Sequence, residues 1–303
     1  MKYLCLADLH LTAYKPDCRL QDEDWIQVLY DKFDTIIHYA SKVDAVILAG
    51  DIFDLWGNVR FEYMNTIIRL FQKVKEATKQ KKIYSIAGNH DCPNHSYDTN
   101  EISRSPYMTL VSVGIFHDLY LDPIDNFCTY LYTDTGKLET SNSPKICVAH
   151  KGLYKGKAGF PNAPKEGNVE HFLTLLPDSV EFVIAGDYHT PFLYEDEKIT
   201  VINCGSLFRR RADQIEYKPA LWLLDTDTRE VEQIYFDIPN KIRRDYIDDI
   251  KEHRQELAEM IGNIDGDFEV KFNYRDNFIR MATDMENGSN MIALFNRMLV
   301  SNK

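Results

Sequence analysis

Short runs of apolar residues alternate along the chain with longer segments in which apolar residues recur at helical spacing. Two long segments, 24–40 and 59–79, predict amphipathic helices because large apolar residues return every three or four positions. The short runs predict strands over residues 2–7, 45–49, 83–87, 145–149, 182–185 and 200–203. This alternation predicts βαβ units and a sheet that is covered on both faces.

The last part of the chain has a different pattern. Residues 220–225 and 231–237 predict a hairpin around Asp227-Thr228, and Pro239 then indicates a boundary. Beyond it we expect a helix over 241–261, a strand over 268–274 and a helix over 291–300. The sequence therefore predicts a large domain over residues 1–238 and a small C-terminal α/β domain over residues 239–303.

Composition narrows the class of protein. Hydrophobic residues make up 44% of the 303 residues and charged residues 27%, which is typical of a globular chain and not of a disordered one. No apolar run approaches the ~18 residues of a membrane span, and the N-terminal segment lacks a signal-peptide cleavage site, so no membrane association is expected. With 35 basic and 47 acidic residues, the net charge of −12 argues against coating nucleic acid through bulk charge.

The six cysteines are scattered and contain no C-x-x-C pair. Three of them, Cys5, Cys147 and Cys204, lie in apolar stretches and are interpreted as small buried hydrophobic residues. A disulfide framework is not expected in a chain of this length without a secretory signal, which favours the cytoplasm. A thiolate metal site would need clustered cysteines, which the sequence does not have.

Five short polar motifs each follow an apolar strand. Strand carboxyl ends converge on one crevice in α/β sheets, so these motifs are expected to meet in space. A glycine before Asp51, Asn89 and Asp187 is expected to allow a sharp exit from the strand. The motifs are Asp8-Leu9-His10, Gly50-Asp51-Ile52-Phe53-Asp54, Gly88-Asn89-His90-Asp91, His150, and Gly186-Asp187-Tyr188-His189.

Carboxylate, imidazole and amide groups without thiolate favour Mn²⁺, Fe²⁺ or Mg²⁺. The motifs hold more candidate ligands than one ion requires. Two ions ~3.5–4 Å apart would clamp a phosphate ester, with Asp51 as the central candidate for the bridging carboxylate. Each motif alone is a weak signal, since a strand-end aspartate often caps a turn and a lone His150 is more often structural. The order of all five at strand ends is what indicates a site.

With these motifs, residues 1–238 resemble the calcineurin-like metallophosphoesterase superfamily, and G-N-H-D is the most specific element. The resemblance implies an α/β fold, a two-layer β-sandwich flanked by helices, with a small C-terminal α/β cap. It implies that His90 is the general acid while a metal-bridging hydroxide attacks in line. It also implies that Asp54 orients or charge-pairs with His90, and that Asp91 pins its own loop. The implied ligands are Asp8, His10, Asp51 and His189 for one metal, and Asp51, Asn89, His150 and Asp187 for the other.

One motif departs from the family pattern. The family usually has G-H-x-H where this chain has Gly186-Asp187-Tyr188-His189. Asp187 either ligates a divalent ion or only hydrogen-bonds a ligand, which would leave the second site weak or partly empty. Ligation is the favoured interpretation, and two Mn²⁺ ions are the leading cofactor hypothesis, with Fe²⁺ or Mg²⁺ as alternatives.

Within the superfamily, the chain is most similar to SbcD-like subunits of DNA repair exonucleases and their phage counterparts. The similarity rests on the first two motifs, on Gly205-Ser206-Leu207 after the predicted strand 200–203, and on the small domain that follows the core. It implies DNA as substrate, as single strands or duplex ends. It also implies an SbcC-like coiled-coil ATPase partner, a homodimer, and the cytoplasm of a bacterium or of a phage-infected host.

Two basic segments are candidate substrate contacts. Residues 141–165 contain five lysines and no acid, with Tyr154 and Phe160 interleaved, next to His150. Lysines could bind phosphates and rings could stack on bases, although an ordinary solvated loop has the same composition. The second basic segment, the three consecutive arginines 209–211, could bind phosphate or pair with acidic residues on the surface. The candidates are Lys151, Lys155, Lys157, Arg209, Arg210 and Arg211.

Three functions remain open on the sequence. The first is a metal-dependent DNA nuclease of the SbcD-like kind. The second, with the same chemistry, is a phosphatase or phosphodiesterase that acts on a small nucleotide or phosphoprotein, which the short C-terminal domain and the acidic balance favour. The third is a DNA- or protein-binding module with impaired catalysis at the altered Asp187 site. Bound cations would offset part of the negative charge, so the value of −12 does not exclude a DNA-cutting enzyme.

Overall fold

Two β-sheets form the centre of the described structure. The computed structural model describes residues 1–237, except 21–22, 58, 96, 157–164, 212–213 and 215, together with Ile242. The first sheet has the order β11-β10-β1-β2-β3-β4, in which β1 to β4 are parallel and β10 and β11 are antiparallel to their neighbours. Its strands are β1 (Lys2–Leu6), β2 (Ala45–Ala49), β3 (Ile83–Ile86), β4 (His117–Asp118), β10 (Ala220–Asp225) and β11 (Glu230–Tyr235).

The second sheet has the order β5-β6-β7-β9-β8. Its strands pair in parallel except for β8, which is antiparallel to β9. Five of the parallel strands, β1, β2 and β3 of the first sheet and β6 and β7 of the second, end at a motif or within two residues of one. The strands are β5 (Phe127–Tyr130), β6 (Ile146–His150), β7 (Phe182–Gly186), β8 (Phe192–Glu195) and β9 (Thr200–Asn203).

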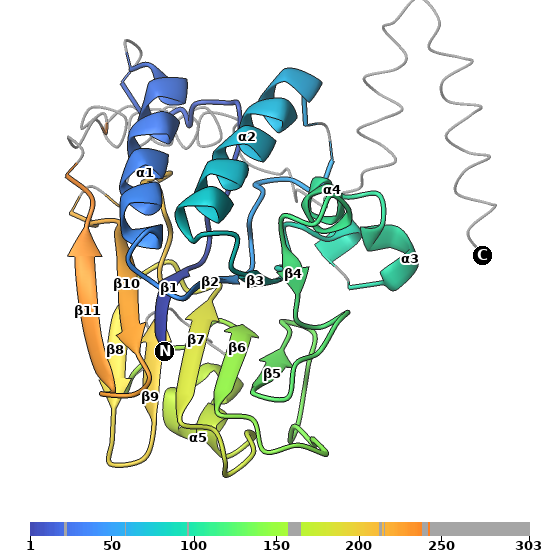
Figure 1. The fold of residues 1–303 in the computed structure, drawn as a ribbon, viewed down its shortest axis with the longest axis vertical. Helices are drawn as coiled ribbons and strands as arrows, with labels where there is room; N and C mark the ends of the chain where they lie inside the picture. The colour runs from blue at the N-terminus through green and yellow to red at the C-terminus, as the bar shows by residue number, and fades with distance from the viewer. Residues whose placement is uncertain are drawn as a thin grey trace, which may run out of the picture. The chain divides into compact units, whose positions relative to one another are not determined.

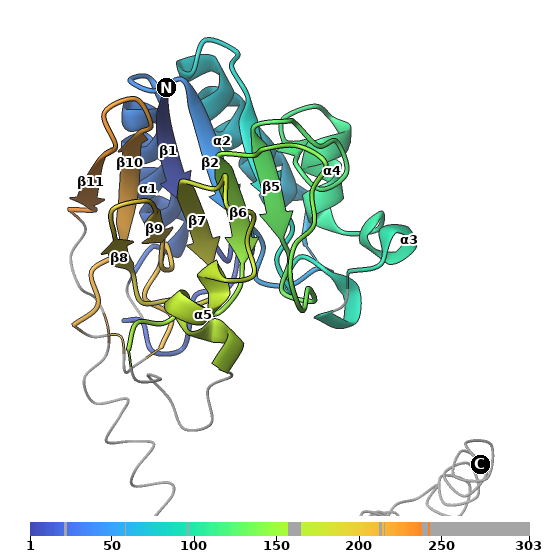
Figure 2. The same ribbon diagram turned by 90° about the horizontal axis from the view of Figure 1, so that it is seen from below.

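Helices cover the outer face of each sheet (Figures 1 and 2). The two long helices, α1 and α2, lie on the first sheet, and the short α5 lies on the second. Helix α1 begins where its sequence predicts, because the Asp24 side chain accepts hydrogen bonds from the backbone N–H groups of Ile26 and Gln27. The helices are α1 (Trp25–Ala40), α2 (Phe61–Ala77), α3 (Thr99–Ile102), α4 (Pro106–Ser112) and α5 (Val169–Leu173), with 3₁₀ turns at Pro93–His95 and Lys165–Gly167.

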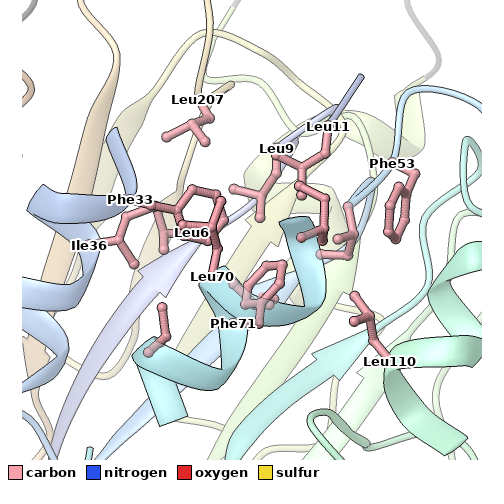
Figure 3. Close-up of a cluster of buried hydrophobic side chains, with 14 of the residues drawn as sticks. Leu6, Leu9, Leu11, Phe33, Ile36, Phe53, Leu70, Phe71, Leu110 and Leu207 are labelled. Atoms are coloured by element: carbon pink, nitrogen blue, oxygen red, sulfur yellow. The ribbon is translucent and has the colours of Figure 1, made fainter. Parts of the chain in front are cut away.

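Alternate residues of each central strand serve two different cores. In β1, Leu4 and Leu6 pack among residues of α1 and α2, as Figure 3 shows for Leu6 with Phe33 and Phe71. The intervening Cys5 faces the core between the two sheets. The layers are therefore helix, sheet, sheet and helix, and the predicted two-layer sandwich flanked by helices is confirmed.

The pattern-based expectation of a sheet covered on both faces is confirmed, although the pattern did not say whether a helix or a second sheet covers each face. Each sheet has helices on one face and the other sheet on its second face. An apolar strand has the same sequence whichever element covers it, so hydrophobicity alone could not distinguish these arrangements.

The elements that the pattern predicted are found with small shifts at their ends. The six early strands and both long helices are confirmed within two residues, as is the hairpin formed by β10 and β11. Strands β4, β5 and β8 and helices α3 to α5 were not predicted, because they are too short to show a period. The predicted elements at 241–261, 268–274 and 291–300, and the domain boundary at 238/239, lie outside the described residues.

Two predictions from composition can be compared with the structure. All six cysteines are buried and free, as expected for Cys5, Cys147 and Cys204. Among the helices that the structure describes, none is long and apolar enough to cross a membrane.

Candidate metal centre

The five motifs meet where both sheets present their carboxyl ends. The loops after β1 and β2 run side by side, since the Asp8 N–H donates to the Gly50 carbonyl at 3.1 Å and the His10 N–H donates to the Asp51 carbonyl at 3.0 Å. The two sheets are joined at the same place. His150, the last residue of β6, donates from Nδ1 to the carbonyl of Ala49 in β2 at 2.8 Å. The site therefore lies at the seam between the sheets.

Three glycines make this close approach possible. A Cβ on Gly50 would lie 2.3 Å from Nδ1 of His150, one on Gly88 would lie 2.2 Å from Oδ1 of Asp51, and one on Gly186 would lie 2.5 Å from the Ala49 carbonyl. Only Gly50, with φ of 87°, also has the left-handed backbone that a sharp exit requires. The sequence interpretation was therefore wrong for Gly88 and Gly186, which are needed for close contact.

Four of the predicted ligands have a left-handed backbone. The φ angles are 48° at Asp8, 42° at His10, 51° at Asp51 and 81° at Asp187. Such conformations are uncommon for residues other than glycine and cost about 1–3 kcal/mol each, so the surrounding structure must hold them. Their concentration in one place is typical of a functional site.

The first ligand group consists of Asp8, His10 and His189, whose ligand atoms all lie within 4.8 Å of one another. The Nε2 atoms of the two histidines are 3.0 Å apart. Nitrogens bound to one ion at about 2.1 Å in adjacent positions would have this separation. Burial lowers the pKa of both histidines, so both are neutral at pH 7 and can offer lone pairs to a cation.

The second ligand group is built around His150. Its Nε2 atom lies 3.3 Å from Oδ1 of Asp51 and 3.0 Å from Oδ1 of Asn89. Because Nδ1 donates to the Ala49 carbonyl, Nε2 is the nitrogen that faces these oxygens. Asp8, Asp51 and His150 also have ligand atoms within 4.8 Å of one another.

Asp51 lies between the two groups. While Oδ1 is near His150, Oδ2 lies 3.6 Å from Nε2 of His10. This is the position that a bridging carboxylate requires. The Asp51 side chain is only 1% exposed, so water does not solvate its negative charge, which cations would have to balance. The donor set fits divalent cations of intermediate to hard character.

His90 is held at one edge of the site by two contacts. Its backbone N–H donates to Oδ1 of Asp51 at 2.8 Å, and its Nδ1 donates to the main-chain carbonyl of Asp54 at 2.7 Å. Nε2 is therefore the nitrogen left for chemistry. His90 also forms a candidate ligand group with His10 and Asp51, so distance alone permits either a proton donor or a ligand.

Asp54 and Asp91 hold the loops that carry the ligands. The main-chain carbonyl of Asp54 accepts from His90, whereas its carboxylate pairs with Arg210, so of the two predicted alternatives the contacts fit orientation of His90 and not a charge pair with it. The Asp91 carboxylate accepts from the backbone N–H groups of Gly88, Ile52 and Phe53 at 2.9–3.1 Å. Asp91 therefore pins the loop of Asp51 as well as its own.

Asp187 contacts the site through its backbone. Its N–H donates to both carboxylate oxygens of Asp8, at 3.0 and 3.1 Å. Its own carboxylate lies beside Gly152, and it is not among the three ligand groups found in the described residues. Ligation by Asp187 stays a prediction.

Four of the six candidate substrate contacts bind other groups of the protein. Nζ of Lys151 donates to the Asp134 carbonyl at 3.1 Å, and Nζ of Lys155 donates to the Leu193 carbonyl at 2.8 Å. Arg209 donates to the Tyr217 carbonyl, and Arg210 pairs with the carboxylate named above. Arg211 is exposed, and Lys157 lies outside the described residues.

The segment Gly205-Ser206-Leu207, called the glycine-serine element below, has a structural role that the sequence did not reveal. The Ser206 N–H donates to the His189 carbonyl and the Leu207 N–H to the Asp8 carbonyl, both at 3.1 Å. Gly205, with φ of 71°, lies so close that a Cβ would be 2.9 Å from the His189 carbonyl. His95 was also missed: its Nδ1 donates to the Asn89 carbonyl at 3.1 Å, and no sequence motif identifies this contact.

Divalent cations are expected to stabilise the protein. Mn²⁺ at 100 times its dissociation constant should add about 2.7 kcal/mol to the free energy of unfolding, a rise in Tm of about 5–10 °C. Scanning calorimetry with and without Mn²⁺, with EDTA reversal as control, measures this. No shift with Mn²⁺, Fe²⁺ or Mg²⁺ would contradict the site.

The same binding is expected to release protons. Burial raises the pKa of Asp8 to about 8. Burial alone would lower the pKa of His150, but the Asp51 carboxylate raises it to about 10. Both groups must lose a proton to bind a metal, so affinity should increase from pH 7 towards pH 9, which titration calorimetry in two buffers can follow.

Comparison with known proteins gives one family. The model of the calcineurin-like phosphoesterase family matches residues 1–197. Among solved structures, the chain is similar to a dimetal phosphatase from Danio rerio at 12% identity and a TM-score of 0.42, over 78% of this chain and 99% of that one. None of the curated proteins matches this chain.

Proposed function

Because this chain belongs to the calcineurin-like phosphoesterase family, we propose that it hydrolyses phosphodiester bonds in DNA as an SbcD-like nuclease subunit. The observation that carries the phosphoesterase chemistry is the position of Asp51 between two groups of ligand side chains. The choice of DNA among phosphate esters rests on the motifs and the glycine-serine element.

Each part of the site has a role in this proposal. The ligands proposed for two divalent ions are Asp8, His10, Asp51, Asn89, His150, Asp187 and His189. When bound, such ions neutralise phosphate charge and activate water, and Mn²⁺ is the proposed species. His90 faces the same space through Nε2 and gives a proton to the leaving oxygen. The sugar oxygen of DNA is a poor leaving group without that proton.

The proposal includes partners beyond the site. DNA would bind as single strands or duplex ends, with Lys151, Lys155, Lys157 and the arginines 209–211 as candidate contacts. To reach phosphate, Lys151 and Lys155 would exchange their present carbonyl partners for phosphate oxygens. An SbcC-like ATPase, a homodimer and a cytoplasmic location complete the proposal.

A second candidate is a phosphatase or phosphodiesterase for a small nucleotide or phosphoprotein. It is favoured by the same lysines, since each would have to leave a main-chain carbonyl before it could contact the phosphates of a polymer. The net charge of −12 also favours it. A binding module with impaired catalysis is a third candidate, favoured by the position of the Asp187 carboxylate outside the three ligand groups of the described residues.

One assay separates these candidates. The full chain is supplied with Mn²⁺ and given linear duplex DNA, single-stranded DNA, an aryl phosphodiester and an aryl phosphomonoester. Cleavage of either DNA supports the proposal, whereas cleavage of the monoester alone contradicts it. If none of the four substrates is cleaved but DNA is still bound, the result favours the binding module with impaired catalysis. The variant His90→Ala, purified in parallel, measures any contaminating nuclease.

A further inference from the structure

Arg210 connects the segment after the glycine-serine element to the metal centre. Its Nη1 atom forms an ion pair with Oδ1 of Asp54, while the preceding Arg209 turns to the carbonyl of Tyr217. The backbone N–H of Arg210 donates to Oε1 of Gln214 at 2.6 Å, which fixes the base of the side chain. Arg210 is therefore held at both ends.

Asp54, the acidic residue of this ion pair, contacts two histidines of the site through two different groups. The main-chain carbonyl of Asp54 accepts from Nδ1 of His90 at 2.7 Å. One carboxylate oxygen, Oδ1, lies 3.8 Å from Nδ1 of His10 and also pairs with Arg210. A shift of the Asp54 backbone would thus move the acceptor that sets the ring of His90, whereas rotation of its side chain alone would change only the contact with His10.

The Asp54 main chain is held on its N-terminal side, where its own N–H donates to the Leu11 carbonyl at 3.2 Å. Before it, the backbone N–H groups of Ile52 and Phe53 are held by a buried carboxylate. After it, Leu55 and Trp56 are 57% and 37% exposed. The ion pair with Arg210 therefore lies between the hydrogen-bonded part of the loop, residues 52–53, and its exposed part, residues 55–56. Its side chains are only 23% and 19% exposed, so water weakens this pair less than a surface pair.

We propose that Arg210 is a positioning residue that acts through Asp54 on His90 and His10. The inference rests on the proposed phosphoesterase function and adds a part to it. The competing role is direct binding of the substrate phosphate by the guanidinium group, which would make Arg210 a substrate-binding residue. The two roles predict different kinetics.

The first test is a kinetic double-mutant cycle on the cleavage of DNA, because its sugar oxygen leaves poorly without the proton that His90 gives. Arg210→Met and Asp54→Ala are each expected to lower kcat about 10- to 100-fold with little change in KM, because a displacement of about 1 Å at His90 costs this much. Asp54→Ala keeps the main-chain carbonyl and removes the carboxylate, and with it both the ion pair with Arg210 and the 3.8 Å contact with Nδ1 of His10. The double variant should be no slower than the slower single variant, since both remove the same contact. Arg210→Lys should recover part of the rate.

A matched control is Arg104→Met, which breaks the ion pair with Glu101 outside the site and should leave kcat and KM unchanged. Two outcomes would overturn the inference: a raised KM with kcat unchanged in Arg210→Met, or losses that multiply in the double variant. Thermal unfolding of each variant identifies any that fail to fold.

The second test does not depend on activity. In the metal-free full chain labelled with ¹⁵N-histidine, the Nδ1–H of His90 should give a slowly exchanging proton signal, assigned by its absence in His90→Ala. Arg210→Met and Asp54→Ala should abolish or broaden it, whereas Arg211→Met and Arg104→Met should keep it. An unchanged signal in Arg210→Met would refute the inference. If the wild type cleaves none of the substrates, the proposed function fails while this signal still decides the role of Arg210.

Discussion

Replacement of His90 by alanine is expected to lower the rate of DNA cleavage about 10²- to 10⁴-fold while the metals stay bound. Nδ1 of His90 donates to the Asp54 carbonyl at 2.7 Å, which leaves Nε2 to protonate the leaving oxygen. Alanine keeps the backbone N–H that donates to Asp51, so the loop should remain in place. Single-turnover cleavage of a labelled duplex measures the rate, and elemental analysis measures the metal.

The leaving group provides a sharper version of this experiment. An aryl oxide leaves readily without a proton, so His90→Ala should slow an aryl phosphodiester far less than it slows DNA. Equal losses on both substrates would contradict a general acid. Loss of metal together with activity would instead show that His90 is a ligand, which its position near His10 and Asp51 permits.

The variant Asp51→Asn is expected to have the second large effect, a loss of about 10³-fold or more in turnover. The asparagine has nearly the same shape and can still accept from the His90 N–H, but it lacks the charge that would neutralise two cations. The increase in Tm with Mn²⁺ should also disappear. Calorimetric titration of the variant with Mn²⁺ gives the number of ions retained.

A matched control for this variant is Asp44→Asn. Asp44 forms a surface ion pair with Lys81, about 40% exposed, so the same chemical change there should affect neither metal binding nor turnover. One tightly bound ion and near-normal turnover in Asp51→Asn would show that this carboxylate does not bridge two ions.

The sequence predicted most of the frame because buried strands leave a strong pattern. The run 45–49 is apolar throughout, and Asp51 follows it at once, so both the strand β2 and its polar loop were evident. The same logic located His150 and His189. It could not predict that two sheets would pack face to face, since an apolar run does not record whether a helix or a sheet covers it.

Other parts of the site leave no trace in side-chain chemistry. The carbonyl of Ala49 that orients His150 and the carbonyl of Asp54 that orients His90 belong to the main chain, which every residue shares. The partners of Lys151 and Lys155 were likewise unpredictable, because a long side chain can reach carbonyls from distant loops. The resemblance to the family implied roles for the motif residues, but it did not indicate which main-chain carbonyls these side chains contact.

The seam between the sheets has a consequence for synthesis of the protein. All ligands that follow strands of the first sheet have been synthesised once the chain reaches Asn89. The second sheet adds His150 and His189 much later. The Asp8 loop is completed only when Leu207 donates to its carbonyl. A nascent chain on the ribosome therefore passes through a long period in which its early carboxylates have no finished site, and the complete ligand set forms only after Leu207 has been added.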